Sequence, residues 1–292
     1  MIQPIIANVS ATRHILNKFH LRASKRLGQN FLIDKSIVDG IVDAADIIKG
    51  EKLLEIGPGI GTLTQGLLEA GADVTAVELD KKLPAVLKET LAGYDNLRVV
   101  QADILKININ ELMNGESFKV AANLPYYITS QIILSLLEQK LPITKIVMMV
   151  QREVADRMIA RPEILAAAKE SARTYGALSV AVQFFTKPRI AFDVPPSAFL
   201  PRPEVNSAVV VCDVLEKPPV QVNDEKFFFK VVRAAFGQRR KVLLNALVGA
   251  GFERSHVLEA LQKSEIDLKR RAETLSLEDF ASLANVILEL TN

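Results

Sequence analysis

The segment Asn123-Leu124-Pro125-Tyr126 joins an amide, a carbonyl and an aromatic ring at the end of an apolar run. The exocyclic nitrogen of adenine is a poor nucleophile because its lone pair is delocalised into the ring. Acceptors that bind both of its hydrogens favour the form whose lone pair can attack an alkyl donor. The Asn123 oxygen and the Leu124 carbonyl are candidate acceptors, Pro125 stiffens the turn, and Tyr126 offers a stacking face. Alone, these residues also suit an ordinary turn after a strand.

A glycine-rich turn lies upstream in Glu55-Ile56-Gly57-Pro58-Gly59-Ile60-Gly61-Thr62, after a predicted strand and before a predicted helix. Glycine lets the backbone approach a ligand, and the start of a helix adds the positive end of its dipole. The dinucleotide fingerprint requires Gly or Ala where this chain has Thr62. An NAD-dependent dehydrogenase is therefore the weaker alternative, since the sequence also lacks a matching catalytic His or Tyr arrangement.

Polar residues follow the next predicted strands at the same register. Glu78 ends the second strand, where a carboxylate can bind two ribose hydroxyls, and Asp103 ends the third, where it can bind an adenine amino group. Asn123 ends the fourth. Each acid by itself could be a surface or capping residue. Together they mark the carboxyl edge of an open sheet, where ligands bind.

Alternating strand and helix patterns predict an α/β fold with a doubly wound, mostly parallel sheet. The expected strands are 52–56, 73–78, 97–101, 118–122, 143–150 and 205–214, and the expected helices are 62–69, 81–91, 130–138 and 151–160. Residues 175–184 are predicted as a helix leading into a strand. Because 143–150 is apolar throughout, we expect that strand to be buried on both faces.

The pattern changes after residue 216, where strand signals end. We expect helices at 224–236, 241–248, 257–262 and 277–290. Ser255 is the predicted N-cap of the third helix, and Ser276 with Asp279 predicts a capping box for the fourth. We therefore predict two domains, 1–216 with a basic N-terminal arm over 1–33, and a smaller helical domain over 217–292.

Composition places the chain among globular proteins. It has 292 residues, 49% hydrophobic and 24% charged, with no apolar stretch long enough to cross a bilayer. The net charge is +2, but residues 1–33 contain five basic and no acidic residues. This arm indicates an anionic partner, nucleic acid ahead of membrane; the alternative is a solvated terminus. The lone Cys212 and three scattered histidines predict no disulfide and no metal site.

The segments from Glu55 to Tyr126 resemble the motifs of class I S-adenosylmethionine-dependent methyltransferases that modify amino groups. Further segments are similar to the family of small-subunit ribosomal RNA adenine N6,N6-dimethyltransferases, over about residues 24–285. They are Leu27-Gly28-Gln29-Asn30-Phe31-Leu32, Val194-Pro195-Pro196-Ser197-Ala198-Phe199-Leu200-Pro201-Arg202-Pro203, Phe236-Gly237-Gln238-Arg239-Arg240-Lys241 and Arg271-Ala272-Glu273-Thr274-Leu275.

The resemblance implies a role for each matching residue. S-adenosyl-L-methionine would be bound by Asn30, Leu32, Gly57, Gly59, Glu78, Asp103, Ile104 and Asn123. Asn123 and Leu124 would hold the target amino group, with Tyr126 and Phe199 packing the base. Family members often carry Asn where this chain has Tyr127, so either tyrosine can face the base, and we favour Tyr126. Ile104 and Phe199 also suit simple core roles.

The resemblance also implies a partner, the small ribosomal subunit through its RNA. The candidate RNA-binding residues are Arg22, Lys25, Arg26, Arg239, Arg240, Lys241, Arg270 and Arg271; the alternative is that the later clusters are solvated helix ends. We expect a cytoplasmic enzyme, monomeric when free, that dimethylates two adjacent adenines without membrane or metal. The alternatives are a large-subunit RNA methyltransferase and a non-catalytic RNA-binding assembly factor.

Overall fold

The computed structural model describes residues 4–24, 27–168 and 174–291 and divides into two compact units. The first unit is Met1–Ala155 with Lys187–Val214, and the second is Asp156–Thr186 with Leu215–Asn292. The sequence analysis placed the boundary near residue 216 and assigned 156–186 to the first part. This segment belongs to the second unit instead, because its helix α9 (Ala177–Phe185) packs against helices from the end of the chain.

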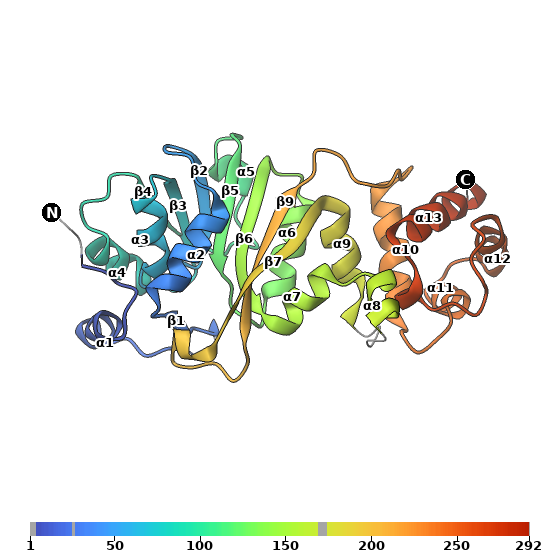
Figure 1. The fold of residues 1–292 in the computed structure, drawn as a ribbon. Helices are drawn as coiled ribbons and strands as arrows, with labels where there is room; N and C mark the ends of the chain where they lie inside the picture. Colours follow the sequence, from blue (N-terminus) through green and yellow to red (C-terminus); the bar gives the residue numbers. More distant parts are fainter. Residues whose placement is uncertain (1–3, 25–26, 169–173, 292) are drawn as a thin grey trace. The chain divides into compact units, whose positions relative to one another are not determined.

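The first unit contains a seven-stranded sheet of order β4-β3-β2-β5-β6-β9-β7 (Figure 1). Its strands are β2 (Lys52–Ile56), β3 (Asp73–Glu78), β4 (Leu97–Gln101), β5 (Phe118–Asn123), β6 (Ile143–Gln151), β7 (Thr186–Val194) and β9 (Ser207–Val214). Strands β2 to β6 run parallel to one another, and β9 is antiparallel to β6. The predicted doubly wound, mostly parallel sheet is confirmed.

Helices cover both faces of this sheet. Figure 1 shows α2 (Lys35–Ala45) and α3 (Thr62–Glu69) over one face and α6 (Thr129–Glu138) behind it. Helices α4 (Leu83–Thr90) and α5 (Ile109–Leu112) complete the crossovers. Residues 146–150 of β6 are buried throughout, as expected for a strand covered on both sides. The loops at the carboxyl ends of β2 to β5 are thus held by a packed core.

The N-terminal arm is folded where the structure describes it. Helix α1 (Val9–Lys18) begins at Asn8, whose side chain accepts from the Ala11 N–H, and it buries Thr12 and Ile15. Just before α1, the Ile6 N–H donates to Gln65 on α3 (2.9 Å). Arg13 and Lys18 therefore lie on a helix packed on the first unit rather than on a solvated tail.

Two strand segments were not predicted. Strand β1 (Phe31–Leu32) pairs with β8 (Phe199–Leu200) in a separate two-stranded sheet, and β8 follows the short helix η3 (Pro196–Ala198). The prediction that 175–184 leads into a strand was wrong in its boundary. Helix α9 continues to Phe185, and β7 then covers Thr186–Val194. Pro188 and the charged residues of β7 hide its strand character in the sequence.

The second unit is helical in its described residues. It contains α8 (Pro162–Ala168), α9, α10 (Glu225–Gly237), α11 (Leu243–Gly249), α12 (Arg254–Lys263), η4 (Ala272–Thr274) and α13 (Leu277–Thr291), and α7 (Arg152–Ile159) spans the division between units. Phe184, Phe228 and Phe229 pack together in its core, with ring centroids 5.0–5.2 Å apart.

The predicted helix caps of this unit had different outcomes. The capping box of α13 is confirmed: the Asp279 N–H donates to Ser276 Oγ, and the Ser276 N–H donates to Asp279 Oδ2, both at 3.0 Å. Ser255 is not the N-cap of α12. The helix begins one turn earlier than expected, and Glu253 is its N-cap, because the Glu253 side chain accepts from the Ser255 N–H.

Candidate active site

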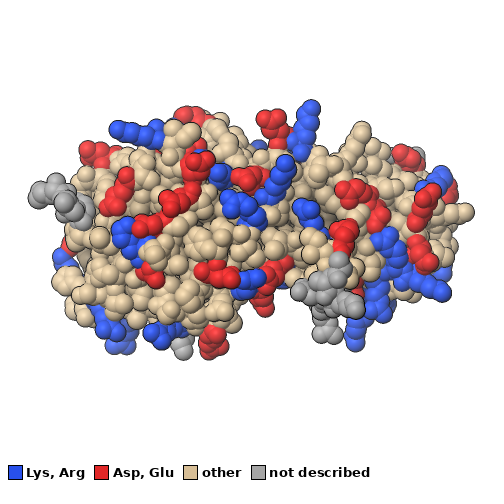
Figure 2. All heavy atoms as spheres, viewed as in Figure 1, with Lys and Arg blue, Asp and Glu red and all other residues tan. Residues whose placement is uncertain are grey.

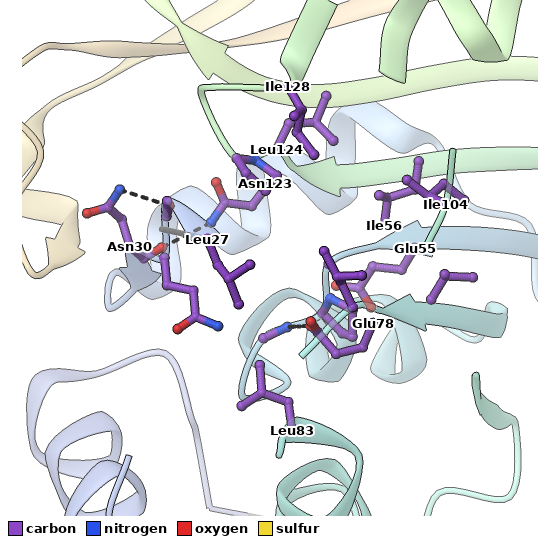
Figure 3. Close-up of a pocket in the computed structure, with 18 of the residues that line it drawn as sticks. Leu27, Asn30, Glu55, Ile56, Glu78, Leu83, Ile104, Asn123, Leu124 and Ile128 are labelled. Atoms are coloured by element: carbon purple, nitrogen blue, oxygen red, sulfur yellow. Dashed lines mark hydrogen bonds between the residues drawn. The ribbon is translucent and has the colours of Figure 1, made fainter. Parts of the chain in front are cut away.

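A pocket opens at the carboxyl ends of β2, β3, β4 and β5 in the first unit (Figure 3). Ten of the predicted site residues line it: Asn30, Leu32, Gly57, Gly59, Glu78, Asp103, Ile104, Asn123, Leu124 and Tyr126. They come from five separate segments of the chain. The common register inferred from the sequence therefore corresponds to one cavity at the edge where parallel strands present ligands.

The glycine turn after β2 forms one wall of the pocket. Gly57 and Gly59 have φ angles of +70° and +61°, which a side chain would strain. At Gly57 a Cβ would meet no other atom within 4 Å, so a side chain there would project into open space. The turn therefore leaves room for a ligand to lie against bare backbone.

Glu78 presents a carboxylate at the end of β3, in the interior of the pocket. Its Oε1 accepts from the Asp80 N–H (2.7 Å) and its Oε2 from the Gly59 N–H (3.2 Å). These bonds fix the carboxylate, whose oxygens keep acceptor capacity that suits the hydroxyls of a ribose. Burial raises the pKa of Glu78 above its usual range.

Glu55 and Thr62 carry buried polar atoms that no group in the described part of the chain satisfies. Glu55 is only 1% exposed, and its Oε2 has no partner; the same is true of Thr62 Oγ1. Burial raises the pKa of Glu55 to about 8. Buried polar atoms are normally paired. Thr64 Oγ1 is also unpaired, and its hydroxyl opposes the rise in the pKa of Glu55, so the Glu55 carboxyl faces Thr64 as well as the pocket.

The Asn123 side chain is oriented by a hydrogen bond to Asn30, a residue 93 positions earlier in the sequence. Its Nδ2 donates to the Asn30 backbone carbonyl at 3.3 Å, as the dashed line in Figure 3 shows. The donor end of the amide is thereby engaged. Within the described residues no group donates to Asn123 Oδ1, so the acceptor end stays available for a substrate amino group.

The rest of the Asn123-Leu124-Pro125-Tyr126 turn is held by its backbone. The Leu124 N–H donates to the Met149 carbonyl (3.2 Å), and the Pro125 carbonyl accepts from the Ile128 N–H (3.2 Å) and Thr129 Oγ1 (3.0 Å). No hydrogen bond to the Leu124 carbonyl occurs among the described residues. The second predicted acceptor is therefore also available, in a turn fixed on both sides.

Tyr126 and Tyr127 both line the pocket but differ in exposure. Tyr126 is partly buried, with its hydroxyl 2.7 Å from Ser207 Oγ. Tyr127 is 55% exposed and packs beside Gly28, where a Cβ would lie 3.3 Å from its ring. The assignment of Tyr126 as the ring that stacks on the base stays a prediction.

Asp103 and Ile104 lie where the adenine of the methyl donor was expected. Asp103 lines the pocket, yet its Oδ1 accepts from the Leu105 N–H (3.1 Å) and its Oδ2 lies 3.6 Å from Lys106 Nζ. It therefore caps the local turn as well as facing the cavity. Ile104 is buried and lines the same wall.

Phe199 differs from the other predicted site residues. It is 1% exposed and does not line the pocket; it lies in β8, paired with Leu32 of β1. This strand pair holds Leu32 at the pocket wall, so Phe199 supports the site from behind. The predicted contact between Phe199 and a base is not favoured by this placement.

The segment before β1 contributes a residue that the sequence analysis did not assign. Gln29 lines the pocket, donates from Nε2 to Asp80 Oδ2 (3.1 Å), and accepts from the Ser24 N–H at Oε1 (2.9 Å). It ties the N-terminal segment to the loop after β3. Its only signal in the sequence was its place within the Leu27–Leu32 motif.

The predicted RNA-binding residues fall into three groups. Arg22, Arg239, Arg240, Lys241 and Arg271 are exposed, although Arg239 Nη2 also donates to the Tyr175 carbonyl (2.6 Å), and Figure 2 shows basic side chains in the region of α10 and α11. Arg270 instead pairs with Asp279 (2.9 Å) and supports the α13 cap, which favours a structural role. Lys25 and Arg26 lie outside the described residues.

Metal ligands and membrane-spanning helices bear on the expected partners. In the described residues, no group of three or more His, Cys, Asp or Glu could hold a metal ion. In the same part of the chain, no helix is both long and apolar enough to span a bilayer.

Comparison with solved structures defines the class of protein. The chain is similar to a dimethyladenosine transferase from Plasmodium falciparum, with a TM-score of 0.71 and 26% identity over 87% of this chain and 95% of that one. It is also similar to the 23S rRNA methyltransferase ErmE, with a TM-score of 0.67 and 26% identity over 88% and 99%. The fold is that of a class I methyltransferase.

Sequence comparison then gives the family. Residues 20–289 match the family Ribosomal RNA adenine dimethylase, and the chain belongs to it. Two relatives named ribosomal RNA small subunit methyltransferase A are each 46% identical: one from Alkaliphilus oremlandii, over 96% of this chain and 97% of the relative, and one from Clostridioides difficile, over 97% and 96%.

Proposed function

We propose that this protein transfers methyl groups from S-adenosylmethionine to N6 of two adjacent adenines in the RNA of the small ribosomal subunit. The observation that carries the proposal is the Asn123 amide, whose nitrogen is engaged by the Asn30 carbonyl while its oxygen stays available. Family membership supports the same reaction. The relatives named above support the small subunit as substrate.

The pocket fits the methyl donor in shape and chemistry. S-adenosylmethionine, when bound, supplies an electrophilic methyl group on a sulfonium. The bare backbone at Gly57 leaves space for it, and the acceptor capacity of Glu78 suits its ribose. The unpaired polar atoms of Glu55 and Thr62 add acceptors to the same cavity.

The chain's residues act on the target base by position and electrostatics. Asn123 Oδ1 and the Leu124 carbonyl accept the two N6 hydrogens and turn the nitrogen lone pair toward the methyl group. Tyr126 stacks on the base. No strongly basic side chain is required, since the alkylated nitrogen becomes acidic and loses its proton afterwards.

The base must leave its stack to reach such a pocket, at a cost of about a few kcal/mol that is smallest for a base in a loop. The exposed residues Arg22, Arg239, Arg240, Lys241 and Arg271 provide positive charge for RNA phosphates. In this proposal the first unit performs the chemistry and the helical unit contacts RNA, with the protein acting as a monomer.

A large-subunit RNA methyltransferase is the competing function, because ErmE shares the fold at 26% identity. The small subunit is favoured by the 46% identity to relatives named for it over nearly the full chain. Tritiated methyl transfer to isolated small and large subunits from cells lacking the modification separates the two. We expect label in small-subunit RNA; label confined to large-subunit RNA would overturn the assignment.

A further inference from the structure

Ser207 is a buried hydroxyl outside every motif considered above, yet it touches the active-site turn. It is 0% exposed and opens strand β9, where it lies opposite Gln151 of β6. Its Oγ is 2.7 Å from the Tyr126 hydroxyl. Since β6 lies between β5 and β9 in the sheet, the Tyr126 side chain reaches across the end of β6 to make this bond.

The backbone around Ser207 is fixed. Ser207 is held by the antiparallel pairing of β9 with β6, and the neighbouring Asn206 carbonyl accepts from the Arg152 N–H (3.0 Å). At the other end, the turn that carries Tyr126 is held through the Pro125 carbonyl. The ring is thus anchored at its backbone and at its hydroxyl, which restricts rotation about both side-chain torsions.

The contact also limits what Tyr126 can do. Its hydroxyl is engaged with Ser207, and burial raises the pKa of the phenol, so Tyr126 stays neutral and is not a general base. Only its ring face is left to meet a substrate. The hydrogen bond therefore serves to orient the ring face and takes no part in proton transfer.

We propose that Ser207 is a positioning residue for methyl transfer, which holds the Tyr126 ring in the orientation that stacks on the target adenine. This inference rests on the proposed function, since it concerns the same pocket. A hydroxyl on the distant strand β9 thereby sets the geometry of the turn after β5.

The test is a double-mutant cycle on small subunits that lack the modification, with Ser207→Ala, Tyr126→Phe and the double variant. Each single change removes one half of the hydrogen bond and keeps the ring. We expect kcat to fall about 5- to 20-fold in each, because small misplacement of a reacting group slows transfer strongly. The double variant should be no slower than the slower single variant, since both remove the same interaction.

Two readouts separate positioning from general damage. The dissociation constant for S-adenosylmethionine and the KM for subunits should stay within about twofold of wild type, and the unfolding midpoint should change as little as in a matched control. Thr186→Val is that control, because it removes another buried hydroxyl, bonded to the Val182 carbonyl away from the pocket.

The outcomes are distinct. The role of Ser207 would be overturned if Ser207→Ala methylated at the wild-type rate or bound S-adenosylmethionine more weakly. It would also be overturned if the losses in kcat of the two single variants multiplied in the double variant. Failure of the wild-type protein itself to methylate small subunits would instead refute the proposed function.

Discussion

Buried charged side chains are paired differently at the two ends of the parallel strands, here called the amino edge and the carboxyl edge of the sheet. At the amino edge, Lys119 at the start of β5 is 7% exposed, and its Nζ donates to the Asp46 carbonyl (2.5 Å) and to Glu51 Oε2 (2.8 Å). At the carboxyl edge, Glu55 of the adjacent β2 is 1% exposed, yet its Oε2 has no hydrogen-bond partner in the described residues.

The difference separates a structural charge from a functional one. A buried charge that is fully paired stabilises the fold relative to losing one partner, whereas unpaired polar groups cost stability and persist where a ligand needs them. The same two strands carry both kinds. Substitutions at the amino edge should therefore lower stability without changing ligand binding. Those at the carboxyl edge should either weaken ligand binding or, where they remove an unpaired buried charge, raise stability.

The largest effect is expected from Asn123→Ala. Loss of the amide removes one acceptor for the target nitrogen, and methyl transfer should fall about 100- to 1,000-fold, by analogy with the loss of one group that stabilises a transition state. Single-turnover rates on unmodified small subunits measure it. The exposed Asn110→Ala on α5 is the control and should behave as wild type.

Binding to small subunits by Asn123→Ala is a second readout of the same variant. Retained binding with lost transfer is expected if recognition and chemistry are separable. Undiminished methyl transfer would contradict the role of the amide and favour a different acceptor.

Lys119→Met tests the amino edge. Removing the ammonium leaves only the Ile48 N–H (3.1 Å) donating to Glu51 Oε2, and because Glu51 is 23% exposed we expect a loss of about 2–3 kcal/mol in the free energy of unfolding, at or below the range for fully buried pairs. Urea denaturation measures it. The affinity for S-adenosylmethionine should not change, and a matching loss of that affinity would break the contrast between the edges.

Glu78→Ala tests the donor subsite. It removes the carboxylate expected to bind the ribose, and the affinity for S-adenosylmethionine should fall about 10- to 100-fold, as for the loss of charged hydrogen bonds. Calorimetric titration measures it. Asp73→Ala is the control, since Asp73 is exposed at the opposite end of the same strand; equal losses in both variants would contradict the assignment.

Glu55→Gln tests the unpaired carboxyl through pH. Because burial raises the pKa of Glu55 from 4.5 to about 8, the folded state keeps a proton that the unfolded state has lost between these values. Wild-type stability from this group is present below pH 4.5 and is lost as the pH rises through 8. The variant stays neutral, so in donor-free protein it should be more stable than wild type at pH 9, by about 1–3 kcal/mol.

The same comparison at pH 4.5 should show almost no difference between Glu55→Gln and wild type, and Glu111→Gln on the exposed surface of α5 should show none at either pH. Parallel stability curves for wild type and Glu55→Gln from pH 5 to 9 would mean that the carboxyl is ionised throughout.

The sequence predicted the parts of the site that depend on strand ends. Glu78 and Asn123 are the last residues of apolar strands, and such strands can be recognised from the local hydrophobic pattern. Because the strands are parallel, their last residues must lie at the same edge of the sheet. The hydrogen bond from Asn123 to Asn30 could not be predicted, because it joins positions 93 residues apart. Ser207 was missed for the same reason.

The other differences from the sequence analysis also depend on tertiary packing. Residues 156–186 join the helical unit through contacts of α9 with α10 and α13, which no local pattern records. Helix α1 buries Thr12 and Ile15, and Ile6 just before it donates to Gln65 of α3, a contact over 59 positions that no local pattern records. Phe199 has an aromatic ring that could stack on a base, but the pairing of its strand with Leu32 places it in the core.

The most direct test of the account is mass-spectrometric mapping of ribosomal RNA from cells with the gene, without it, and with only the Asn123→Ala form. We predict two neighbouring N6,N6-dimethyladenosines in small-subunit RNA of the first strain and unmodified adenines in the other two. Full dimethylation in the absence of the gene, or with the Asn123→Ala form alone, would contradict the claim that this amide holds the nitrogen that receives the methyl group.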